Sequence, residues 1–326
     1  MKTKHRFLAR WQNLLGLFLV LLFVIVAIAA PLLSPQDPEN PGPIKYLGLK
    51  TNYQPLPPSE APPLGTLSTQ ISVYHALVWG TRSAVVFGIL VASITALIGT
   101  LIGAVSAYFG GFINNLLMRF TDAFLAFPII AGVVLISQLI TNAFSGAGVD
   151  VLATPFGMYY KYSGGGDFIY ELKDLPKLLN FLLNIEPVLI AFILFSWMPY
   201  ARIMNTVVRR VRNTDYIEAS RALGAGHSRL IFRHLIPNSI TPIIVMAAKD
   251  VGGMVLSQAT FTFIGLGGNS PWGLMLVRGR DWIISPGGIL TYWWVFLPAT
   301  LALILFGIGW NLLGDGLNDA LNPRAT

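Results

Sequence analysis

The sequence EASRALGAGHSRLIFRHLIPN occupies Glu218–Asn238, a polar and basic stretch that lies between two long apolar runs. The chain as a whole is strongly apolar, since 54% of its 326 residues are hydrophobic and 11% are charged, with a mean hydropathy of +0.63. A soluble domain carries about 25% charged residues, so this composition excludes a soluble globular protein and indicates one embedded in a bilayer. The quoted stretch is therefore expected to be a loop outside the membrane.

Apolar runs long enough to cross a bilayer recur along the chain. A helical span needs about 20 residues to cover the hydrocarbon layer. The continuous apolarity, without the alternation of barrel strands, favours helices. The predicted spans are Asn13–Leu33, Ala84–Tyr108, Leu116–Ile140, Leu178–Met198, Ile240–Leu266 and Thr291–Leu313. The expected fold is an all-α bundle of six transmembrane helices.

The sequence lacks the patterns of several kinds of chemistry. It has no cysteine, and its four histidines, His5, His75, His227 and His234, have no metal-ligand spacing. It has no GxxxxGK[ST] motif for ATP and no paired carboxylates suited to acid–base catalysis. We therefore expect no catalytic residue, metal site or bound cofactor in this chain. Any energy from ATP must come through a partner.

Lysine and arginine are distributed unequally between the loops. With the N-terminus inside, the basic N-terminal segment 2–10, the region 202–233 and Arg324 fall on one side, whereas most acidic residues fall on the other. Both termini and the loop 213–238 are therefore expected in the cytoplasm. The net charge of +7 follows from this topology and from attraction to anionic inner-leaflet lipid, rather than from binding of nucleic acid.

The positions of the spans and prolines divide the chain into three parts. Residues 1–33 hold the cytoplasmic N-terminus and the first helix, which is too long for a usual signal peptide and is expected to stay as an anchor. Residues 34–80 are rich in proline and are expected to form an outer loop. Residues 81–326 hold the remaining five helices.

The loop itself carries helix signals. Asp215 stands three positions before Glu218, which predicts a helix with Asp215 as its cap. Gly224 is suited to end that helix, because glycine readily takes a left-handed conformation. Ser228 predicts the cap of a second short helix, which Pro237 is expected to end. The loop is therefore predicted to be two short helices joined by a tight turn.

Two interpretations of this hairpin remain open. Helical spacing places Tyr216, Ala219, Ser220 and Leu223 on one narrow face, and the small residues let another surface approach closely. The hairpin could be a solvated surface feature. Against this stand the apolar residues of the second helix, which need burial against something: Leu230, Ile231, Phe232, Leu235 and Ile236.

The longer string YIEASRALGAGHSRLIFRHLIPNSITPIIV resembles the EAA loop of permease subunits of bacterial ABC importers. The resemblance implies that the loop fits a groove of an ATP-binding subunit, so that closure of the ATPase pair moves the permease helices as rigid bodies. The residues expected to contact that subunit are Glu218, Ala219, Ser220, Leu223, Gly224, Ala225, His234, Pro237 and Asn238.

Five other stretches narrow the resemblance to the dipeptide, oligopeptide and nickel importers, and to the second of their two permease subunits. They are LMRFTDAFLAFP at 117–128, Trp197–Arg202, FIGLGG at 263–268, SPWGLMLVRGR at 270–280 and NLLGDGLNDALNPR at 311–324. The resemblance implies the type I ABC importer permease fold. It also implies a multi-pass location in the cytoplasmic (inner) membrane and a peptide or similar small solute as cargo.

The resemblance also implies partners. These are a second homologous permease subunit, expected to form a heterodimer, two ATP-binding subunits that hold ATP and Mg, and an extracytoplasmic solute-binding protein. Two regions depart from the family pattern. Before the second span, Gly65 and Thr66 match, but the polar and glycine positions that follow are replaced by Leu67, Gln70, Ile71 and Ser72. The segment 142–177 stands where relatives have a short connection. We interpret this outer insert as a structured element that contacts the solute-binding protein or caps the pathway, with an unstructured loop as the alternative.

Lys249 and Asp250 are unusual within a predicted span, because ionisable groups in a membrane normally face a partner or a wet cavity. Adjacent residues diverge by about 100° around a helix. One is therefore expected to line the translocation pathway while the other pairs across the subunit interface. The alternative is that both lie near the cytoplasmic end and reach the interface. Gln258, two turns further on, is another pathway candidate.

Small residues form a stripe along the second predicted span. Its members are Gly88, Ala92, Ala96, Thr100 and Ala104, with Gly99 and Gly103 beside them. Such stripes let helices approach closely in lipid, so a packing role is expected.

Two other classes of function stay open on the residues alone. A self-sufficient channel or secondary transporter should carry inverted repeats or a relay of intramembrane acids. The sequence shows neither feature, beyond Asp250. A membrane scaffold without transport activity would use the hairpin purely for docking.

Overall fold

The computed structural model describes residues 10–36, 42–47, 53–146, 149–154, 157–162, 186–284, 288 and 290–321. Between 140 and 162 it is the backbone alone that is described. Predictions that concern residues 163–177 of the insert, the start of the span Leu178–Met198 and the charged chain ends lie outside the described residues.

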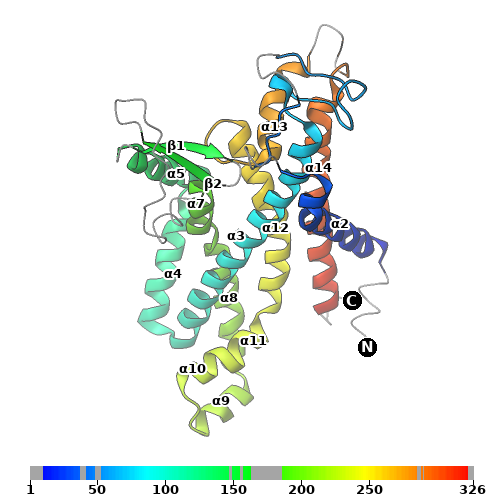
Figure 1. Cartoon of the computed structure of the whole chain (residues 1–326). Coiled ribbons are helices and arrows are strands. Elements are labelled where there is room, and N and C mark those ends of the chain that lie inside the picture. Colours follow the sequence, from blue (N-terminus) through cyan, green and yellow to red (C-terminus); the bar gives the residue numbers. More distant parts are fainter. Residues whose placement is uncertain are drawn as a thin grey trace.

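The described chain is a bundle of long helices with a short helical hairpin projecting from one end (Figure 1). The all-helical membrane fold is thus confirmed. The bundle helices are α2 (Trp11–Leu33), α3 (Val73–Phe109), α4 (Gly111–Ala126), α5 (Ile129–Gly146), α7 (Pro187–Ser196), α8 (Met198–Val211), α12 (Thr241–Phe263), α13 (Pro271–Gly279) and α14 (Trp293–Leu321). The hairpin comprises α9 (Asp215–Ala222), α10 (His227–Arg229), the π-helical η2 (Leu230–Leu235) and α11 (Ile236–Ser239).

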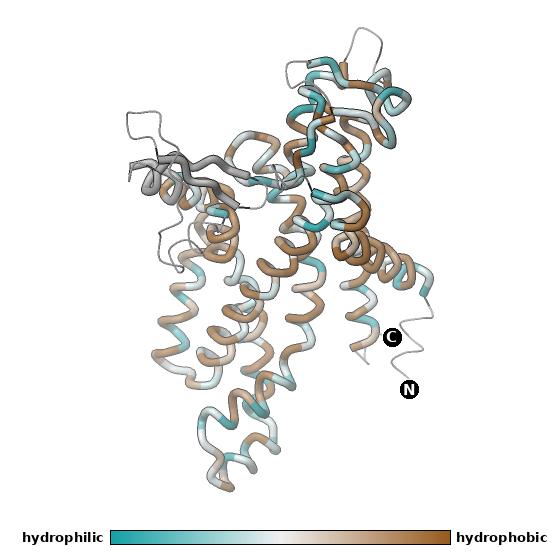
Figure 2. Tube along the Cα trace, viewed as in Figure 1, coloured by the Kyte–Doolittle hydropathy of each residue, from teal (hydrophilic) through white to brown (hydrophobic). Residues whose placement is uncertain are grey.

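Two further features lie at the end opposite the hairpin, called the far end below (Figure 1). Within the insert, β1 (Val149–Thr154) and β2 (Gly157–Tyr162) pair antiparallel with Val149 opposite Tyr162. The short 3-10 turns η1 (Ser68–Gln70) and η3 (Arg280–Trp282) lie beside α13. Figure 2 shows hydrophobic residues along the bundle helices and hydrophilic ones gathered at the far end and in the hairpin.

Between four and six helical segments of the described chain are long and apolar enough to cross a membrane. Four do so alone: α2, α3, α14 and the joined pair α7 and α8, Pro187–Val211. Two bent pairs raise the number to six if each is one span: α4 with the start of α5, bent by 88°, and the hairpin helices with α12, bent by 61°. The predicted number of six corresponds to the upper figure.

Several predicted span boundaries were wrong. The second span starts at Val73 and not at Ala84, so the loop predicted over 34–80 is helical from Val73 onward. The last helix continues to Leu321, beyond the predicted end at Leu313.

Proline explains two further differences. The span Leu116–Ile140 breaks at Phe127, whose backbone is extended at φ −80° and ψ 131°, because Pro128 disfavours the helical conformation of the residue before it. The span expected to end at Met198 continues as α8 to Val211, since Pro199 lies in the first turn of that helix, where it is tolerated.

The small-residue stripe of α3 packs against α8 and α12, as predicted. A Cβ added at Gly99 would lie 2.5 Å from the carbonyl oxygen of Trp197 and closer still to Tyr200. At Gly103 the added atom would clash with the carbonyl oxygen of Ala201. These glycines therefore let the α3 and α8 backbones approach more closely than any side chain would allow.

A buried polar network reinforces the same contact. The Asn205 amide of α8 donates one hydrogen bond to Ser106 Oγ of α3 at 2.7 Å and another to Asn114 Oδ1 of α4 at 2.8 Å. All three side chains are buried. Polar groups inside a membrane bundle need partners of this kind, so the network fixes how α3, α4 and α8 lie against one another.

Replacing Gly99 by Ala is expected to lower the midpoint of thermal unfolding in detergent, because overpacking costs about 1–3 kcal/mol. Gly253→Ala is the matched control, since nothing lies within 4 Å of a Cβ at that helical glycine. Equal midpoints for the two variants would contradict the close approach of α3 and α8.

Candidate coupling hairpin and polar cavity

The first hairpin helix starts differently from the prediction. Thr214 is the residue before the helix, with extended dihedrals of φ −90° and ψ 150°, so Asp215 is the first helical residue and not the cap. The Thr214 hydroxyl donates instead to the Val211 carbonyl at 2.6 Å, which links α8 to the hairpin. Gly224 takes φ +81° just after the helix and makes the tight turn, as predicted.

The second half of the hairpin also differs from the prediction. It begins at His227 after Gly226, so the predicted cap Ser228 was wrong. Nor does Pro237 end the helix, which continues through a π-helical turn into α11 and bends by 61° into α12. A proline ring clashes with the carbonyl oxygen four residues earlier in a regular helix, and the wider π turn makes room for it.

One side of the hairpin is buried within the chain itself. Ile217, Leu230, Ile231 and Leu235 are at most 5% exposed and pack with residues of α3 and α8. The burial that these apolar residues of the second helix need is therefore provided within the chain and not by a separate partner. Phe232 is the exception and is 57% exposed.

The other side of the hairpin is exposed. Tyr216 is 45% and Leu223 89% exposed, together with Phe232. Of the predicted contact residues, the exposed ones are Glu218, Ala219, Leu223, Gly224, Pro237 and Asn238, and the partly exposed ones are Ser220, Ala225 and His234. The structure thus brings all the predicted contact positions into one projecting element.

The hairpin is tied to the end of α3 by contacts that the sequence analysis missed. Tyr108 Oη and His227 Nδ1 form a hydrogen bond of 2.6 Å. The Arg212 guanidinium donates through Nη1 to the carbonyl oxygens of Ala107 at 2.8 Å and Tyr108 at 3.1 Å. Because the last carbonyls of a helix lack partners within it, Arg212 caps α3 with a cation, where the helix dipole favours one.

Lys249 and Asp250 each have a partner within the chain. Lys249 Nζ forms an ion pair of 2.5 Å with Asp315 of α14, and Asp250 Oδ2 accepts a hydrogen bond of 2.7 Å from Tyr200 of α8. Both side chains line a cavity of about 820 Å³, together with Asn238 and residues of α8, α12 and the end of α14. Each side chain thus has a partner within the chain, and the expected contact of one of them across a subunit interface stays a prediction.

Gln258 lies apart from this cavity. It is 2% exposed, and its amide donates to Glu186 Oε2 at 2.9 Å, while the backbone N–H of Asn269 donates to Glu186 Oε1 at 2.7 Å. Burial raises the pKa of the Glu186 carboxyl above its usual value, and the hydrogen bonds from Asn269 and Gln258 offset part of this shift. Sequence reasoning missed Glu186, because nothing in the sequence distinguishes it from the other acidic residues that were expected outside the membrane.

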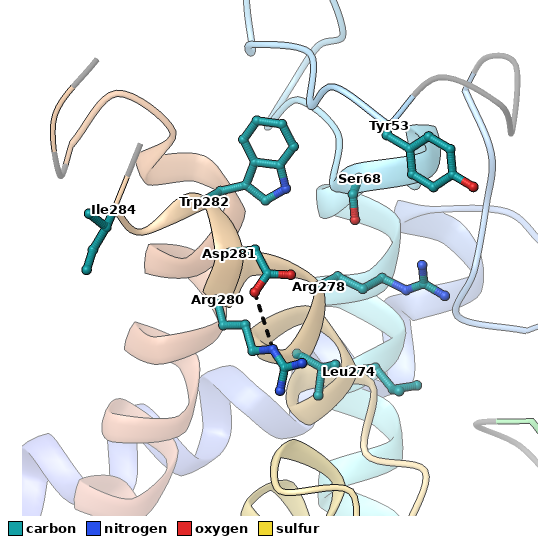
Figure 3. A pocket seen from close by; sticks show the side chains of 9 residues that line it. Tyr53, Ser68, Leu274, Arg278, Arg280, Asp281, Trp282 and Ile284 are labelled. Atoms are coloured by element: carbon teal, nitrogen blue, oxygen red, sulfur yellow. Dashed lines mark ion pairs between the residues drawn. The ribbon is translucent and has the colours of Figure 1, made fainter. Parts of the chain in front are cut away.

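A second hollow lies at the far end, between α13, η3 and the loop around η1 (Figure 3). It measures about 560 Å³ and is lined by Tyr53, Ser68, Leu274, Val277, Arg278, Arg280, Asp281, Trp282 and Ile284. Arg278 donates to Thr69 Oγ1 at 3.3 Å, and Arg280 pairs loosely with Asp281 at 3.5 Å. This hollow therefore presents two guanidinium groups.

Two protein-family models match this chain. Residues 99–326 match the family described as the binding-protein-dependent transport system inner membrane component. Residues 3–62 match the N-terminal transmembrane domain of oligopeptide transport permease C. The chain belongs to this family of ABC importer permeases, in its dipeptide and oligopeptide branch, as the resemblance in the sequence had indicated.

Individual relatives agree over almost the whole chain. It is 29% identical over 310 residues to a probable D,D-dipeptide transport system permease protein of Escherichia coli, which covers 94% of this chain and 86% of the relative. It is 30% identical over 315 residues to a glutathione transport system permease protein of Pectobacterium atrosepticum, covering 95% and 85%. For an oligopeptide transport system permease protein of Bacillus subtilis the identity is 28% over 324 residues, covering 98% and 88%. The chain is therefore the inner-membrane permease subunit of an ABC importer.

Replacing Asp250 by Asn is expected to reduce solute uptake by about ten-fold, equivalent to about 1.4 kcal/mol, while assembly in the membrane stays normal. The change removes the charge that faces the cavity and keeps an oxygen for the Tyr200 hydroxyl. Tyr200→Phe is the control, because it removes the hydrogen bond and keeps the charge. Parallel loss of uptake and assembly in Asp250→Asn would instead identify a structural pair.

Proposed function

We propose that this chain pairs with a second, homologous permease subunit to form the pathway of an importer for a peptide or similar small solute. The cargoes in the names of its relatives, a D,D-dipeptide, glutathione and oligopeptides, support this class of solute. In the proposed complex, two ATP-binding subunits hold ATP and Mg, and an extracytoplasmic solute-binding protein delivers the cargo. The hairpin end then faces the cytoplasm, in line with the distribution of basic residues.

The division of the hairpin into a buried and an exposed side carries the proposal that it couples to an ATP-binding subunit. Its buried side fixes the hairpin to α3 and α8 through Ile217 and Leu235. Three large side chains of this polar element are exposed, Tyr216 on α9, Leu223 just after it and Phe232 on η2. Exposed apolar residues in a rigid setting are the usual anchors of a protein interface.

Motion would pass from the hairpin to the bundle along two routes. One is the hydrogen bond of His227 with Tyr108 and the capping of α3 by Arg212. The other is the continuous chain from α11 into α12. Because one route consists of short polar contacts and the other of the continuous chain, a displacement of the hairpin would move α3 and α12 with it.

Lys249 and Asp250 are proposed to line the cytoplasmic half of the translocation pathway, since both face the cavity of about 820 Å³ near the hairpin end. Gln258, on the same helix but bound to Glu186, is proposed to act at the outer half. The β1–β2 hairpin lies at the far end, and the hollow with Arg278 supplies polar groups there, where the solute-binding protein would dock.

Leu223→Asp is expected to reduce ATP-driven uptake by about 30-fold, the effect of losing a contact worth ~2 kcal/mol. The thermal midpoint of the isolated chain should not change, because Leu223 is 89% exposed. Ser228→Ala, at an exposed position of the same hairpin, serves as the control. Full uptake by Leu223→Asp would rule out this face as the coupling surface.

Deletion of residues 149–174 tests the insert. We expect weaker docking of the solute-binding protein and slower uptake, because the deletion removes the β1–β2 hairpin at the far end. Binding of the ATPase subunits, measured in the same membranes, should stay unchanged. If docking and uptake both persist, the insert has no role in either.

Reconstitution in vesicles tests the function as a whole. Uptake that requires ATP, the ATPase pair and a solute-binding protein supports the proposal. Gradient-driven uptake by this chain alone would contradict it and favour a secondary transporter.

A further inference from the structure

A third hollow lies where α3 turns into α4, at the hairpin end of the bundle. It measures about 360 Å³ and is lined by Ala107, Gly110, Gly111, Arg209, Arg212 and Asn213. The residue between the two helices, Gly110, has φ +67°, and Gly111 has φ +47°. A Cβ at Gly110 would lie 3.0 Å from Arg212 Nη1, so the glycine keeps room for the guanidinium.

The charge of this hollow is positive. Arg209 is exposed and has no ion-pair or hydrogen-bond partner among the described residues, and Arg212 uses Nη1 on two backbone carbonyls. The Asn213 side chain lies next to Arg212, where its Oδ1 accepts a hydrogen bond of 3.5 Å from Arg212 Nε. No acidic side chain lines the hollow within the described part of the chain. Two guanidinium groups that line one hollow without a lining carboxylate fit a phosphate group better than a cation or a neutral ligand.

The surroundings distinguish a lipid phosphate from a soluble one. The hollow lies at the ends of two candidate membrane spans, since α3 ends at Phe109 and the span of α7 and α8 ends at Val211. Beside Gly111, the side chains of Phe112 and Ile113 are 79% and 40% exposed. Large apolar side chains exposed beside a cationic hollow at a membrane boundary are suited to acyl chains next to a headgroup.

We propose that the hollow formed by Arg209, Arg212, Asn213 and the Gly110–Gly111 turn binds the phosphate of an anionic phospholipid in the adjacent leaflet. The acyl chains of that lipid lie along Phe112 and Ile113. The site is separate from the exposed face of the coupling hairpin and does not depend on the proposed cargo. Because Arg212 also caps α3, a bound lipid would stabilise the joint between α3 and the hairpin.

The test uses the full-length chain in detergent with added phosphatidylglycerol or phosphatidylcholine of identical acyl chains. Native mass spectrometry counts the lipid molecules that stay bound. The intact chain should retain phosphatidylglycerol in preference to phosphatidylcholine. Arg209→Gln should weaken this retention about five-fold, as expected for one arginine near an anionic surface. Arg209 is exposed, so this variant should fold normally.

Arg210→Gln is the matched control, because Arg210 is also exposed on the last turn of α8 but does not line the hollow. It should retain phosphatidylglycerol like the unchanged chain. Equal weakening by Arg209→Gln and Arg210→Gln would overturn the site in favour of general surface attraction. Release of the lipid by inorganic phosphate at an equal concentration would overturn the lipid assignment in favour of a soluble anion.

Discussion

The close approach of α3 to α8 at Gly99 and Gly103 is the contact on which the rest of the structure depends. In a membrane, apolar side chains gain little by leaving lipid, so helices associate through tight packing and polar bonds. Here the glycines provide the packing and Asn205 provides the bonds. Since α8 leads directly into the hairpin, this contact also determines where the hairpin projects.

Several of the contacts described above lie at the end of α3. Its last carbonyls are capped by Arg212, its Tyr108 binds His227 of the hairpin, and the turn at Gly110 forms the wall of the proposed lipid site. A single guanidinium thus contributes to the helix end, to the joint with the hairpin and to the cationic hollow. Lipid composition and ATPase contact would therefore act on the same joint.

The sequence predicted features that depend on local signals. The apolar runs, the turn at Gly224 and the small stripe of α3 follow from composition and period alone. Most of what it missed depends on residues far away in the chain, such as the bond of Gln258 to Glu186 across 72 residues and that of Tyr108 to His227 across 119. The Pro237 error has a different cause, because a π-helical turn has no simple sequence pattern.

Helix α12 connects the two ends of the proposed pathway. It carries Lys249 and Asp250 near the hairpin and Gln258 eight positions after Asp250, about 12 Å further along the axis at 1.5 Å per residue. The hairpin continues into this helix through one bend, and Gln258 holds Glu186 at its other end. A rigid helix held in this way cannot move at one end alone. A displacement imposed on the hairpin would therefore alter the polar cavity and the Glu186 contact together, which is the linkage that alternating access requires.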